Sequence, residues 1–372
     1  MRFPEFTEEW KAEQLDNIAT LSKGIGISKE QLSEDGEPCI LYGELYTKYK
    51  SEIIKQVESK TDINGSKLKR SKANDVIIPC SGETAVDIAT ARCVPFDNIL
   101  FGGDLNVISL HQYDGAFMSY QLNGKRKYDI ARVAQGVSIV HLYGEHLKAI
   151  KTYNPTLPEQ QKIAKLLSLL DDRIDTQNKI IEDLKLLKSA ISLNVLHSDT
   201  WEQFKIKDIA QIGRGRVISS IEISQQKNPT YPVYSSQTSN DGIMGYLDDY
   251  MFEGEYISWT TDGANAGTVF YRNGKFNCTN VCGLLKLIKG FDTHFVSLVL
   301  AEATKKYVSI NLANPKLMNN TMGNIQICLP KLEEQKRISI VFRVLQRLWT
   351  VHNSLLTEYI KQKQYLLSQM FI

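Results

Sequence analysis

The sequence predicts an α+β protein in which two globular domains of mixed strand and helix alternate with two long helices. Three observations predict this fold class. Two segments share one heptad pattern of apolar residues, the segments upstream of them share a second pattern, and the remainder reads as short strands punctuated by Gly and Asn. We therefore expect an internal repeat with approximate two-fold symmetry, whose two helices form an antiparallel coiled coil. The length of 372 residues suits more than one domain.

The predicted boundaries are a first domain at 1–153, a helix segment at 154–198, a second domain at 199–328 and a last helix segment at 329–372. Within the first domain, Asp75 to Pro79 reads as a strand, and Ile99 to Leu110 reads as a pair of strands. In the second domain, Glu255 to Trp259 and Phe276 to Ile288 read in the same two ways.

The two helices are predicted over 158–196 and 333–371, because the same heptad returns when 175 is added to each residue number. Eight of the ten a and d positions are apolar in each helix. A Leu-Pro pair, Leu157-Pro158 or Leu329-Pro330, is predicted to precede each helix, and a Glu-Gln pair to open it. Neither helix contains Gly or Pro after its first turn, so at about 1.5 Å per residue each would be roughly 57 Å long.

The polar exceptions to the heptad fall at equivalent places in the two helices. They are Gln177 and His352 at a positions, and Lys188 and Lys363 at d positions. We expect Gln177 and His352 to meet at the midpoint of an antiparallel pair and to fix its register; the alternative is that both are partly exposed and have no role. The two lysines are expected to extend past the apolar seam into solvent.

Further apolar side chains lie outside the a and d stripe, and a pair of helices cannot cover them all. A further helical partner is therefore expected, unless the globular domains cover them. These residues are Leu166, Leu169, Leu186 and Leu187 in the first helix and Val341, Val344, Leu355 and Leu367 in the second.

The second repeated pattern begins at Trp10 and at Trp201, and in each copy it runs on to a basic residue followed by glycine. These pairs are Lys23-Gly24 and Arg214-Gly215. A pseudo-two-fold repeat also requires the end of the second helix, near Phe371, to lie close to Met1.

Composition excludes several classes of protein. Hydrophobic residues make up 42% and charged residues 23%, which excludes wholesale disorder and collagen-like repeats. Six cysteines without framework spacing fit a reducing cytoplasm, and no metal site is expected. No apolar run of about 18 residues predicts a membrane span, and the polar start of the chain is not a signal peptide. The net charge of +2 gives no general argument for nucleic-acid binding, so that case depends on local features.

Several sequence strings occur in a fixed order along the chain. They are the opening Phe3-Pro4-Glu5-Phe6-Thr7-x-x-Trp10, the two basic-Gly pairs, Leu157-Pro158-Glu159-Gln160-Gln161-Lys162-Ile163, the run from Tyr234-Ser235-Ser236 to Gly242-Ile243-Met244-Gly245-Tyr246, and Trp259-Thr260-Thr261-Asp262-Gly263. With these strings the chain resembles the DNA-specificity subunit of type I restriction–modification enzymes over essentially its whole length.

The resemblance implies two target-recognition domains, each reading one half of a split, asymmetric sequence in double-stranded DNA. It implies that the helices space the half-sites and dock two methylation subunits, which restriction subunits then join. It further implies that this chain is not catalytic and that S-adenosylmethionine, Mg²⁺ and ATP are used by its partners. The alternative from another class is a helical-rod scaffold that binds only protein.

Candidate DNA-contacting residues are cations for phosphate and polar side chains in loops for base edges. For each basic run, a solvated surface is the competing interpretation, and for the basic-Gly pairs it is a purely structural turn. The candidates are Lys23, Lys67, Lys69, Arg70, Lys72, Lys125, Arg126, Lys127, Arg214, Arg216, Ser236, Gln237, Thr238, Asn240, Thr261 and Asn265, with Lys316, Asn319 and Asn320 near the end of the second domain.

Catalytic motifs are not found in the sequence. Asn228-Pro229-Thr230-Tyr231 only approaches the Pro-Pro-aromatic loop of amino-methyltransferases, and the phosphate-binding Gly-x4-Gly-Lys-Ser/Thr loop is absent.

Cys278 and Cys282 have no further zinc ligands nearby in the sequence, so they read as small buried side chains.

Overall fold

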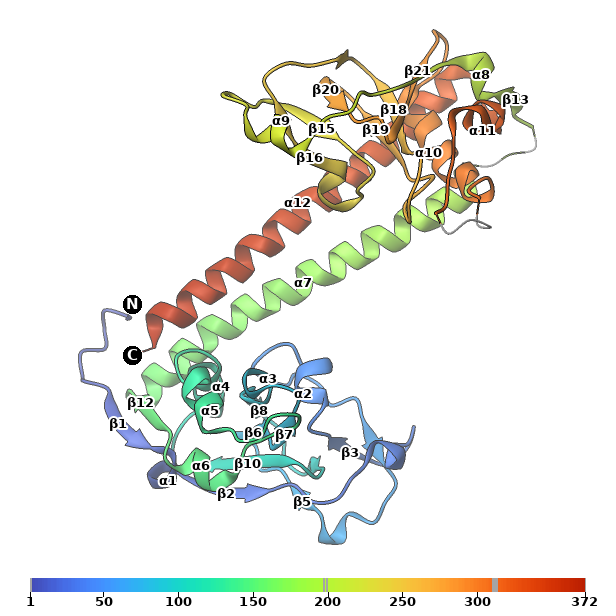
Figure 1. The fold of residues 1–372 in the computed structure, drawn as a ribbon. Helices are drawn as coiled ribbons and strands as arrows, with labels where there is room; N and C mark the ends of the chain where they lie inside the picture. Colours follow the sequence, from blue (N-terminus) through green and yellow to red (C-terminus); the bar gives the residue numbers. More distant parts are fainter. Residues whose placement is uncertain (1, 197, 199, 310–313, 372) are drawn as a thin grey trace. The chain divides into compact units, whose positions relative to one another are not determined.

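The computed structural model describes residues 2–196, 198, 200–309 and 314–371. The chain divides into two units. Unit 1 is formed by Met1–Ile180 with His352–Ile372, and unit 2 by Ile181–Val351. Each unit contains one globular domain and about half of each long helix, so that the helices α7 (Leu157–Val195) and α12 (Leu332–Met370) belong to both units (Figure 1).

The long helices form as the heptads predict, and each begins and ends within one residue of its expected bounds. Their starts are anchored identically. The side-chain amide of Gln160 donates to the Pro155 carbonyl at 2.8 Å, and that of Gln335 donates to the Pro330 carbonyl at 2.8 Å. The equivalent prolines are therefore Pro155 and Pro330. The prediction that a Leu-Pro pair precedes both helices is wrong for α7, because Leu157-Pro158 lies inside its first turn.

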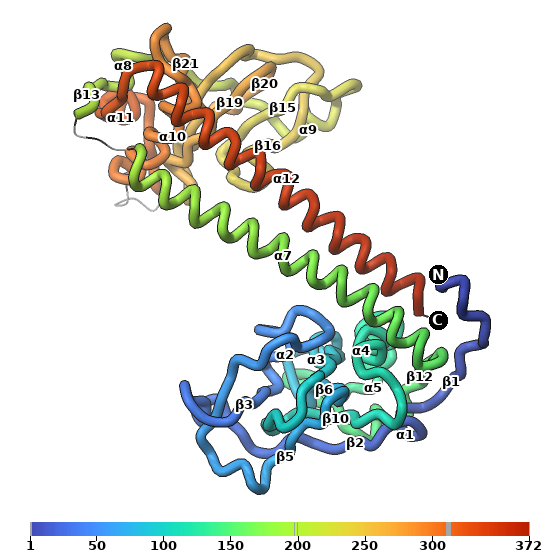
Figure 2. The backbone as a smooth tube through the Cα atoms, turned by 180° about the vertical axis from the view of Figure 1, so that it is seen from behind, coloured from blue at the N-terminus to red at the C-terminus, as the bar shows by residue number. Residues whose placement is uncertain are grey.

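Within each unit the two helices run antiparallel. In unit 1, Asp171 on α7 contacts Lys363 on α12. Gln177, one to two turns further along α7, lies against His352 of α12. In unit 2, Lys188 contacts Gln346. Figure 2 shows the helices as the green and red tubes, with both described ends of the chain in unit 1. There the rings of Trp10 and Phe371 are 6.4 Å apart, while Met1 lies outside the described residues.

The domain of unit 1 is built on two four-stranded sheets. The first has the order β2-β10-β6-β8 and is antiparallel; the second has the order β4-β3-β9-β5, in which β3 and β9 are parallel. Two short strand pairs, β1-β12 and β11-β7, complete it. The strands are β1 (Lys11–Gln14), β2 (Ala19–Lys23), β3 (Glu37–Ile40), β4 (Lys60–Thr61), β5 (Lys69–Arg70), β6 (Asp75–Pro79), β7 (Ser81–Gly82), β8 (Arg92–Val94), β9 (Leu100–Phe101), β10 (Leu105–Leu110), β11 (Val140–His141) and β12 (Lys151–Asn154).

The domain of unit 2 repeats this topology. Its antiparallel sheet has the order β14-β21-β18-β19, and its mixed sheet β16-β15-β20-β17 again has one parallel pair, β15 with β20. The pair β13-β22 matches β1-β12. The strands are β13 (Glu202–Lys205), β14 (Ala210–Arg214), β15 (Tyr231–Tyr234), β16 (Ile243–Leu247), β17 (Phe252–Glu253), β18 (Tyr256–Thr260), β19 (Val269–Arg272), β20 (Lys275–Cys278), β21 (Cys282–Leu287) and β22 (Gln326–Leu329).

Short helices cover the sheets and also match between the units. The helices α4 and α10 are capped alike, since Asp114 accepts from the Phe117 N–H and Asp292 from the Phe295 N–H, each at 2.7 Å. The short helices are α1 (Leu15–Ile18), α2 (Glu44–Thr47), α3 (Ala85–Ile88), α4 (Gly115–Asn123), α5 (Lys127–Val133) and α6 (Gly144–Lys148) in unit 1, and α8 (Ile206–Ile209), α9 (Ser220–Ser224), α10 (Thr293–Ala303) and α11 (Asn319–Asn324) in unit 2.

The predicted α+β class with an internal repeat is confirmed, but one prediction about strand pairing is wrong. Ile99 to Leu110 was expected to hold two strands paired with each other, and so was Phe276 to Ile288. Instead β9 and β10 belong to different sheets, as do β20 and β21. In both units the intervening turn carries the chain from the mixed sheet to the antiparallel sheet, so each strand pairs with partners that are distant in sequence.

No helix within the described ranges combines the length and the apolar character that crossing a bilayer requires.

Candidate nucleic-acid interface

Lys23 and Arg214 occupy equivalent places at the ends of β2 and β14, and both are exposed. The Lys23 ammonium lies 5.8 Å from the ring centre of Tyr143, the residue that precedes α6. The Arg214 Nε donates to the Oδ1 of Asn319, the first residue of α11, at 2.9 Å. The same position in the two domains thus presents different chemistry.

The glycines after these two cations have a packing explanation. A Cβ at Gly24 would lie 1.9 Å from the Gly102 carbonyl oxygen, and one at Gly215 would lie 1.7 Å from that of Cys278. Only glycine permits so close a backbone approach. The structural interpretation of the repeated basic-Gly turn is therefore sufficient for the glycines, and the argument for DNA contact rests on the cations alone.

In unit 2 the structure brings several predicted residues into one patch. The loop after β18 joins the segment before α11, because the Gly263 N–H donates to the Pro315 carbonyl at 3.0 Å and the Leu317 N–H to the Thr261 carbonyl at 2.8 Å. Arg214 contacts the same segment. We call this surface the unit-2 patch; it consists of Arg214, Asn265, Lys316, Asn319 and Asn320, all exposed or half-exposed.

Thr261 does not present its hydroxyl at this patch. The residue is 2% exposed, and its Oγ1 donates to the Val281 carbonyl at 2.9 Å. Its side chain holds the loop in shape, and the neighbouring exposed amide of Asn265 is the group that faces solvent.

The loop after β15 is organised by Arg272, which sequence reasoning missed. The Arg272 guanidinium lies 3.6 Å from the ring centre of Tyr234 and donates to the Asp241 carboxylate at 2.8 Å. Its side chain is only 2% exposed. In the sequence, Arg272 precedes Asn273-Gly274 and looks like an ordinary turn residue, so no local signal reveals this role.

The polar candidates of this loop differ in their availability. Gln237 is half-buried and donates to the Ile243 carbonyl, and Ser236 is also half-exposed. Thr238 and Asn240 are exposed, and Asn240 has the left-handed φ of 48° that short amide side chains tolerate.

Arg216 is already paired within its own domain. Its guanidinium binds both carboxylate oxygens of Glu222, and this hydrogen bonding lowers the pKa of Glu222. The two side chains are 43% and 32% exposed, so solvent screens the pair and it contributes little stability. The Arg214 guanidinium is bound to a neutral amide, so no carboxylate neutralises its charge and it can attract a phosphate.

The first basic run of unit 1 lies around β5. It too contains one cation that is held in an ion pair and others that are exposed. Arg70 forms a two-point ion pair with Glu37, with the shorter contact at 2.6 Å. Lys67 and Lys72 are exposed, and Lys69 is half-exposed.

The second basic run of unit 1 lies at the start of α5. Arg126 pairs with Asp129 at 3.2 Å, and its guanidinium lies 5.4 Å from the ring centre of Tyr153. Burial, and then the charge of Arg92, lowers the pKa of Lys127. Lys125 is exposed. These contacts give Arg126 a structural role in unit 1, and Lys127 is half-buried beside it.

The seam of unit 1 contains a buried ionic cluster that the sequence did not predict. The Lys363 ammonium lies 2.5 Å from the Glu52 carboxylate and 2.6 Å from that of Asp171. Tyr120 also donates to Asp171 at 2.6 Å. Burial raises the pKa of Asp171 against the opposing effect of Lys363. The cluster therefore ties the globular domain of unit 1 to both helices.

The expectation that Lys363 extends into solvent is wrong, because its side chain is only 14% exposed. Its equivalent Lys188 is exposed as expected and makes a single 3.4 Å hydrogen bond to Gln346. Gln346 stands where unit 1 has Asp171, so Lys188 meets a neutral amide at the place where Lys363 meets a carboxylate.

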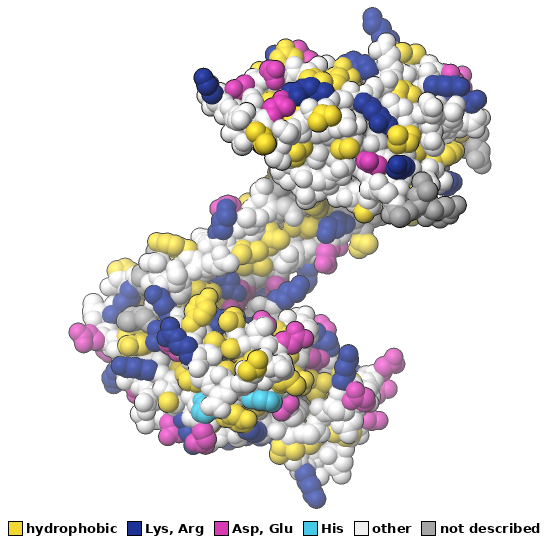
Figure 3. Space-filling model, in the orientation of Figure 1, with side chains coloured by type: hydrophobic (Ala, Val, Ile, Leu, Met, Phe, Trp, Pro, Cys, Tyr) yellow, Lys and Arg dark blue, Asp and Glu magenta, His cyan; other side chains and the backbone are white. Residues whose placement is uncertain are grey.

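The long helices carry apolar side chains that the domains leave exposed. Figure 3 shows hydrophobic side chains along their visible surface, and on that face Lys and Arg are interspersed with Asp and Glu. Of the residues predicted to need a further partner, Leu367 is half-buried in unit 1 and the others are exposed. The exposed ones are Leu166, Leu169, Leu186, Leu187, Val341, Val344 and Leu355, and Ile340, Leu348 and Val351 join them.

Within the part of the chain that the structure describes, no three His, Cys, Asp or Glu side chains form a group that could hold a metal ion. Cys278 and Cys282 are both buried, as small apolar side chains would be.

Comparison with known proteins identifies the same repeat. A family model described as the type I restriction modification DNA specificity domain matches twice, at residues 7–186 and 198–361. A putative type I specificity subunit of Mycoplasma pneumoniae, S.MpnORF201P, is 39% identical over 198 residues, which are 52% of this chain and 82% of that protein. The MpnII type I restriction enzyme specificity subunit of the same organism is 43% identical over 150 residues, 40% of this chain and 44% of that one.

The fold is similar to that of a solved type I restriction–modification S subunit from M. genitalium, with a TM-score of 0.73 and 17% identity over 100% of this chain and 97% of that one. Two matches to one family model, in a chain whose two domains share one topology, leave a single assignment: the chain belongs to the type I restriction–modification DNA specificity family.

Proposed function

We propose that this chain is the DNA-binding specificity subunit of a type I restriction–modification complex, and that each domain reads one half of a bipartite, asymmetric site. The observation that carries the proposal is that the two domains share the topology of both four-stranded sheets but expose different side chains at equivalent positions. Where unit 1 presents Lys23 beside Tyr143, unit 2 presents Arg214 beside Asn319. A repeated frame with changed contact residues suits two readers of unlike sequences.

The long helices would space the two half-sites and dock two methylation subunits. Each helix is 39 residues long, uninterrupted and shared by both units. Each unit also exposes apolar side chains on its helices, such as Leu169 in unit 1 and Val344 in unit 2. Exposed apolar faces of this kind mark protein-binding surfaces. The duplication supports two equivalent docking sites, with restriction subunits joining the resulting core.

The chain itself would perform no chemistry. S-adenosylmethionine, Mg²⁺ and ATP would be bound by the methylation and restriction subunits, and the complex would act in the cytoplasm. The absence of a phosphate-binding loop and of a methyltransferase loop from the sequence supports this division of labour.

Methylome sequencing of the host with and without the gene tests the proposal. We expect one bipartite methylated motif with a fixed spacer to disappear when the gene is deleted, and to return when it is restored. Retention of every motif would contradict a specificity role. Replacing residues 199–328 with the corresponding domain of a relative should change only one half of the motif.

A gel-shift measurement separates this function from that of a protein-binding scaffold. The first domain and the second are nearly neutral, so the isolated chain is expected to bind DNA weakly and to need the methylation subunits. Failure of the assembled complex to bind any duplex would favour the scaffold.

A further inference from the structure

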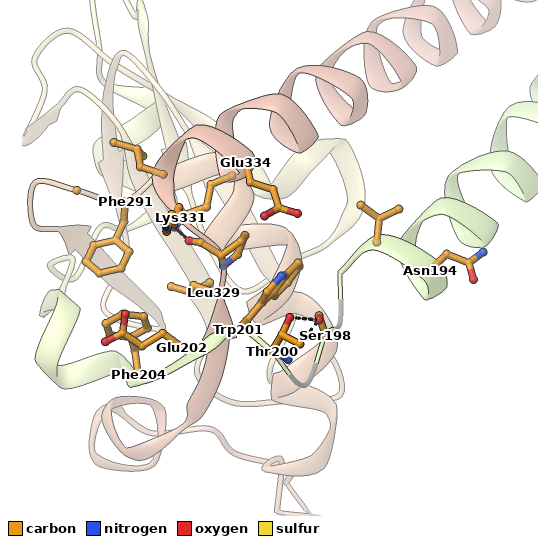
Figure 4. Close-up of a pocket in the computed structure, with 15 residues that line it drawn as sticks. Asn194, Ser198, Thr200, Trp201, Glu202, Phe204, Phe291, Leu329, Lys331 and Glu334 are labelled. Carbon is orange, nitrogen blue, oxygen red and sulfur yellow. Dashed lines mark hydrogen bonds between the residues drawn. The ribbon is translucent and has the colours of Figure 1, made fainter.

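Unit 2 contains a cavity of about 810 Å³ beside the start of α12. Its walls include Asn194, Trp201, Phe204, Phe291, Leu329 and Glu334 (Figure 4). Phe204 and Phe291 meet edge to face at 5.2 Å and form an apolar side. Glu334 is exposed, and within the described ranges neither its carboxylate nor the Trp201 indole N–H has a hydrogen-bond partner. The cavity thus combines an aromatic wall with an available carboxylate.

The internal repeat shows what this kind of site holds, because unit 1 has the same site. Glu159 and Trp10 are the equivalents of Glu334 and Trp201. There the Arg2 guanidinium donates to both oxygens of Glu159, at 2.7 Å each, and the Trp10 indole donates to the same carboxylate at 3.3 Å. The Glu159 side chain is 0% exposed. A two-point contact of this kind is specific for a planar guanidinium.

The residues after Arg2 fill the rest of the unit-1 site. Phe3 packs in one apolar cluster with Trp10 and Phe371. The Lys162 ammonium lies 4.5 Å from the Phe3 ring centre and 5.9 Å from that of Phe6, and it also pairs with Glu5. The groove that remains beside these residues in unit 1 has a volume of only about 180 Å³.

The remaining walls of the two sites also correspond. Leu329, Pro330 and Leu332 of the larger cavity stand where unit 1 has Asn154, Pro155 and Leu157. The equivalent of Lys162 is Arg337, which is exposed one turn after Glu334. Unit 2 therefore retains a carboxylate for a guanidinium, an indole beside it, and a cation able to cover an aromatic ring.

We propose that the unit-2 cavity binds a segment of a partner protein in which an arginine is followed by an aromatic residue and, two positions later, by a carboxylate. The arginine would pair with Glu334, the aromatic ring would lie against Trp201 under Arg337, and the carboxylate would pair with Arg337. This pattern is that of Arg2-Phe3-Pro4-Glu5 in unit 1.

A different protein, rather than a second copy of this chain, is the occupant that the contacts favour. In each copy, Arg2 already binds its own Glu159. Transfer of that segment to the cavity of another copy would exchange one ion pair for an equivalent one and would leave the buried Glu159 without its cation, which is strongly unfavourable.

Peptide binding to the full-length chain tests the proposal. The probe is the N-acetylated, C-amidated peptide of residues 2–7, Arg-Phe-Pro-Glu-Phe-Thr, with a fluorophore for anisotropy. The tethered N-terminal segment, at an effective concentration on the order of millimolar, keeps the peptide out of the unit-1 site. We expect saturable binding that is weakened at least about tenfold by E334Q, the effect of losing one charged hydrogen-bonded pair.

Two controls make the result specific. E333Q neutralises the adjacent exposed carboxylate of the same helical turn and should leave the affinity unchanged. A peptide with glutamine in place of arginine should bind wild-type chain as weakly as the original peptide binds E334Q. The proposal is overturned if no saturation is reached by millimolar peptide, or if E334Q and E333Q behave alike. Concentration-dependent dimers of the chain that E334Q dissociates would also overturn it, in favour of a second copy as occupant.

Discussion

The Nδ1 of His352 lies 2.7 Å from the side-chain oxygen of Gln177, and both residues are half-buried on facing helices of unit 1. The prediction that these polar a positions meet is thereby confirmed. Each residue is the other's equivalent in the repeat, so a shift of one helix by a single turn would separate the only polar a positions of the two heptads. Their role in fixing the register stays a prediction.

Replacing both residues with leucine tests that role. We expect the free energy of unfolding of the Gln177→Leu, His352→Leu variant to rise by roughly 1–3 kcal/mol, because two leucines bury more apolar surface at a positions than a polar pair does. The register should become less unique, so the methylated sites should show more than one spacer length. Denaturant unfolding and methylome sequencing measure the two effects. An unchanged stability with a single spacer would refute a register role.

Removal of the Lys363 charge should be far more costly than removal of its equivalent. Lys363→Met leaves Glu52 and Asp171 buried together without a cation, and we expect a loss of about 3–5 kcal/mol in unfolding free energy. Lys188→Met removes only an exposed hydrogen bond to Gln346, and we expect a loss below about 1 kcal/mol. Urea denaturation of both variants measures the difference. Equal losses of unfolding free energy in the two variants would show that the buried cluster adds no stability beyond that of an exposed contact.

The sequence predicted the helices to within one residue because their signals are local and repeated. A heptad, the lack of Gly and Pro, and a Glu-Gln pair at each start all recur in both copies. The meeting of Gln177 with His352 followed from the same periodicity, since equal offsets place equivalent positions opposite each other in an antiparallel pair. The helices depend on neighbours within one or two turns, and the meeting of Gln177 with His352 depends on the repeat offset; a single sequence displays both.

What could not be predicted depends on residues far apart in the chain. The sheet to which β9 or β10 belongs is decided by strands distant in sequence. Lys363 is buried because Glu52, more than three hundred residues away, supplies a charge. Arg272 is buried between aromatic rings and Asp241 for the same reason. Of the candidate site, the exposed cations were predictable as a class, but their existing partners were not.

His294 should make unit 2 sensitive to mild acid. Burial, followed by the nearby charge of Arg343, lowers the pKa of His294 to about 4. Its Nδ1 is 2.9 Å from the Ser339 hydroxyl, and the Tyr271 ring packs against it. Asp292, Lys188 and Glu255 are the other charged groups that act on it.

The unfolded chain binds a proton at a histidine near pH 6.5, whereas the folded chain does so only near pH 4. Stability is therefore lost as the pH falls from about 6.5 towards 4, with no further loss from this group below that range. His294→Gln should reduce the difference in unfolding free energy between pH 7.5 and pH 5, while His111→Gln, at an exposed histidine of unit 1, serves as the control. Identical pH dependence in wild type and His294→Gln would exclude this origin.

Arg214 and Arg216 should differ in their contribution to DNA binding, although sequence alone places them together. Arg214 is exposed, and its described partners, the Asn319 amide oxygen and the Met318 sulfur, are both neutral, whereas Arg216 is held by the Glu222 carboxylate. In the complex with methylation subunits, Arg214→Gln should weaken binding to all duplexes alike, and the slope of log affinity against log salt should fall by about 0.9 for one lost phosphate contact. Arg216→Gln should change the slope by less, because Glu222 already neutralises its charge.

Fluorescence anisotropy over a salt series, with specific and random duplexes, measures both slopes. If Arg214→Gln weakens only the specific duplex, the side chain reads a base rather than a phosphate, and if Arg216→Gln has the larger slope change, the pairing with Glu222 does not persist on DNA.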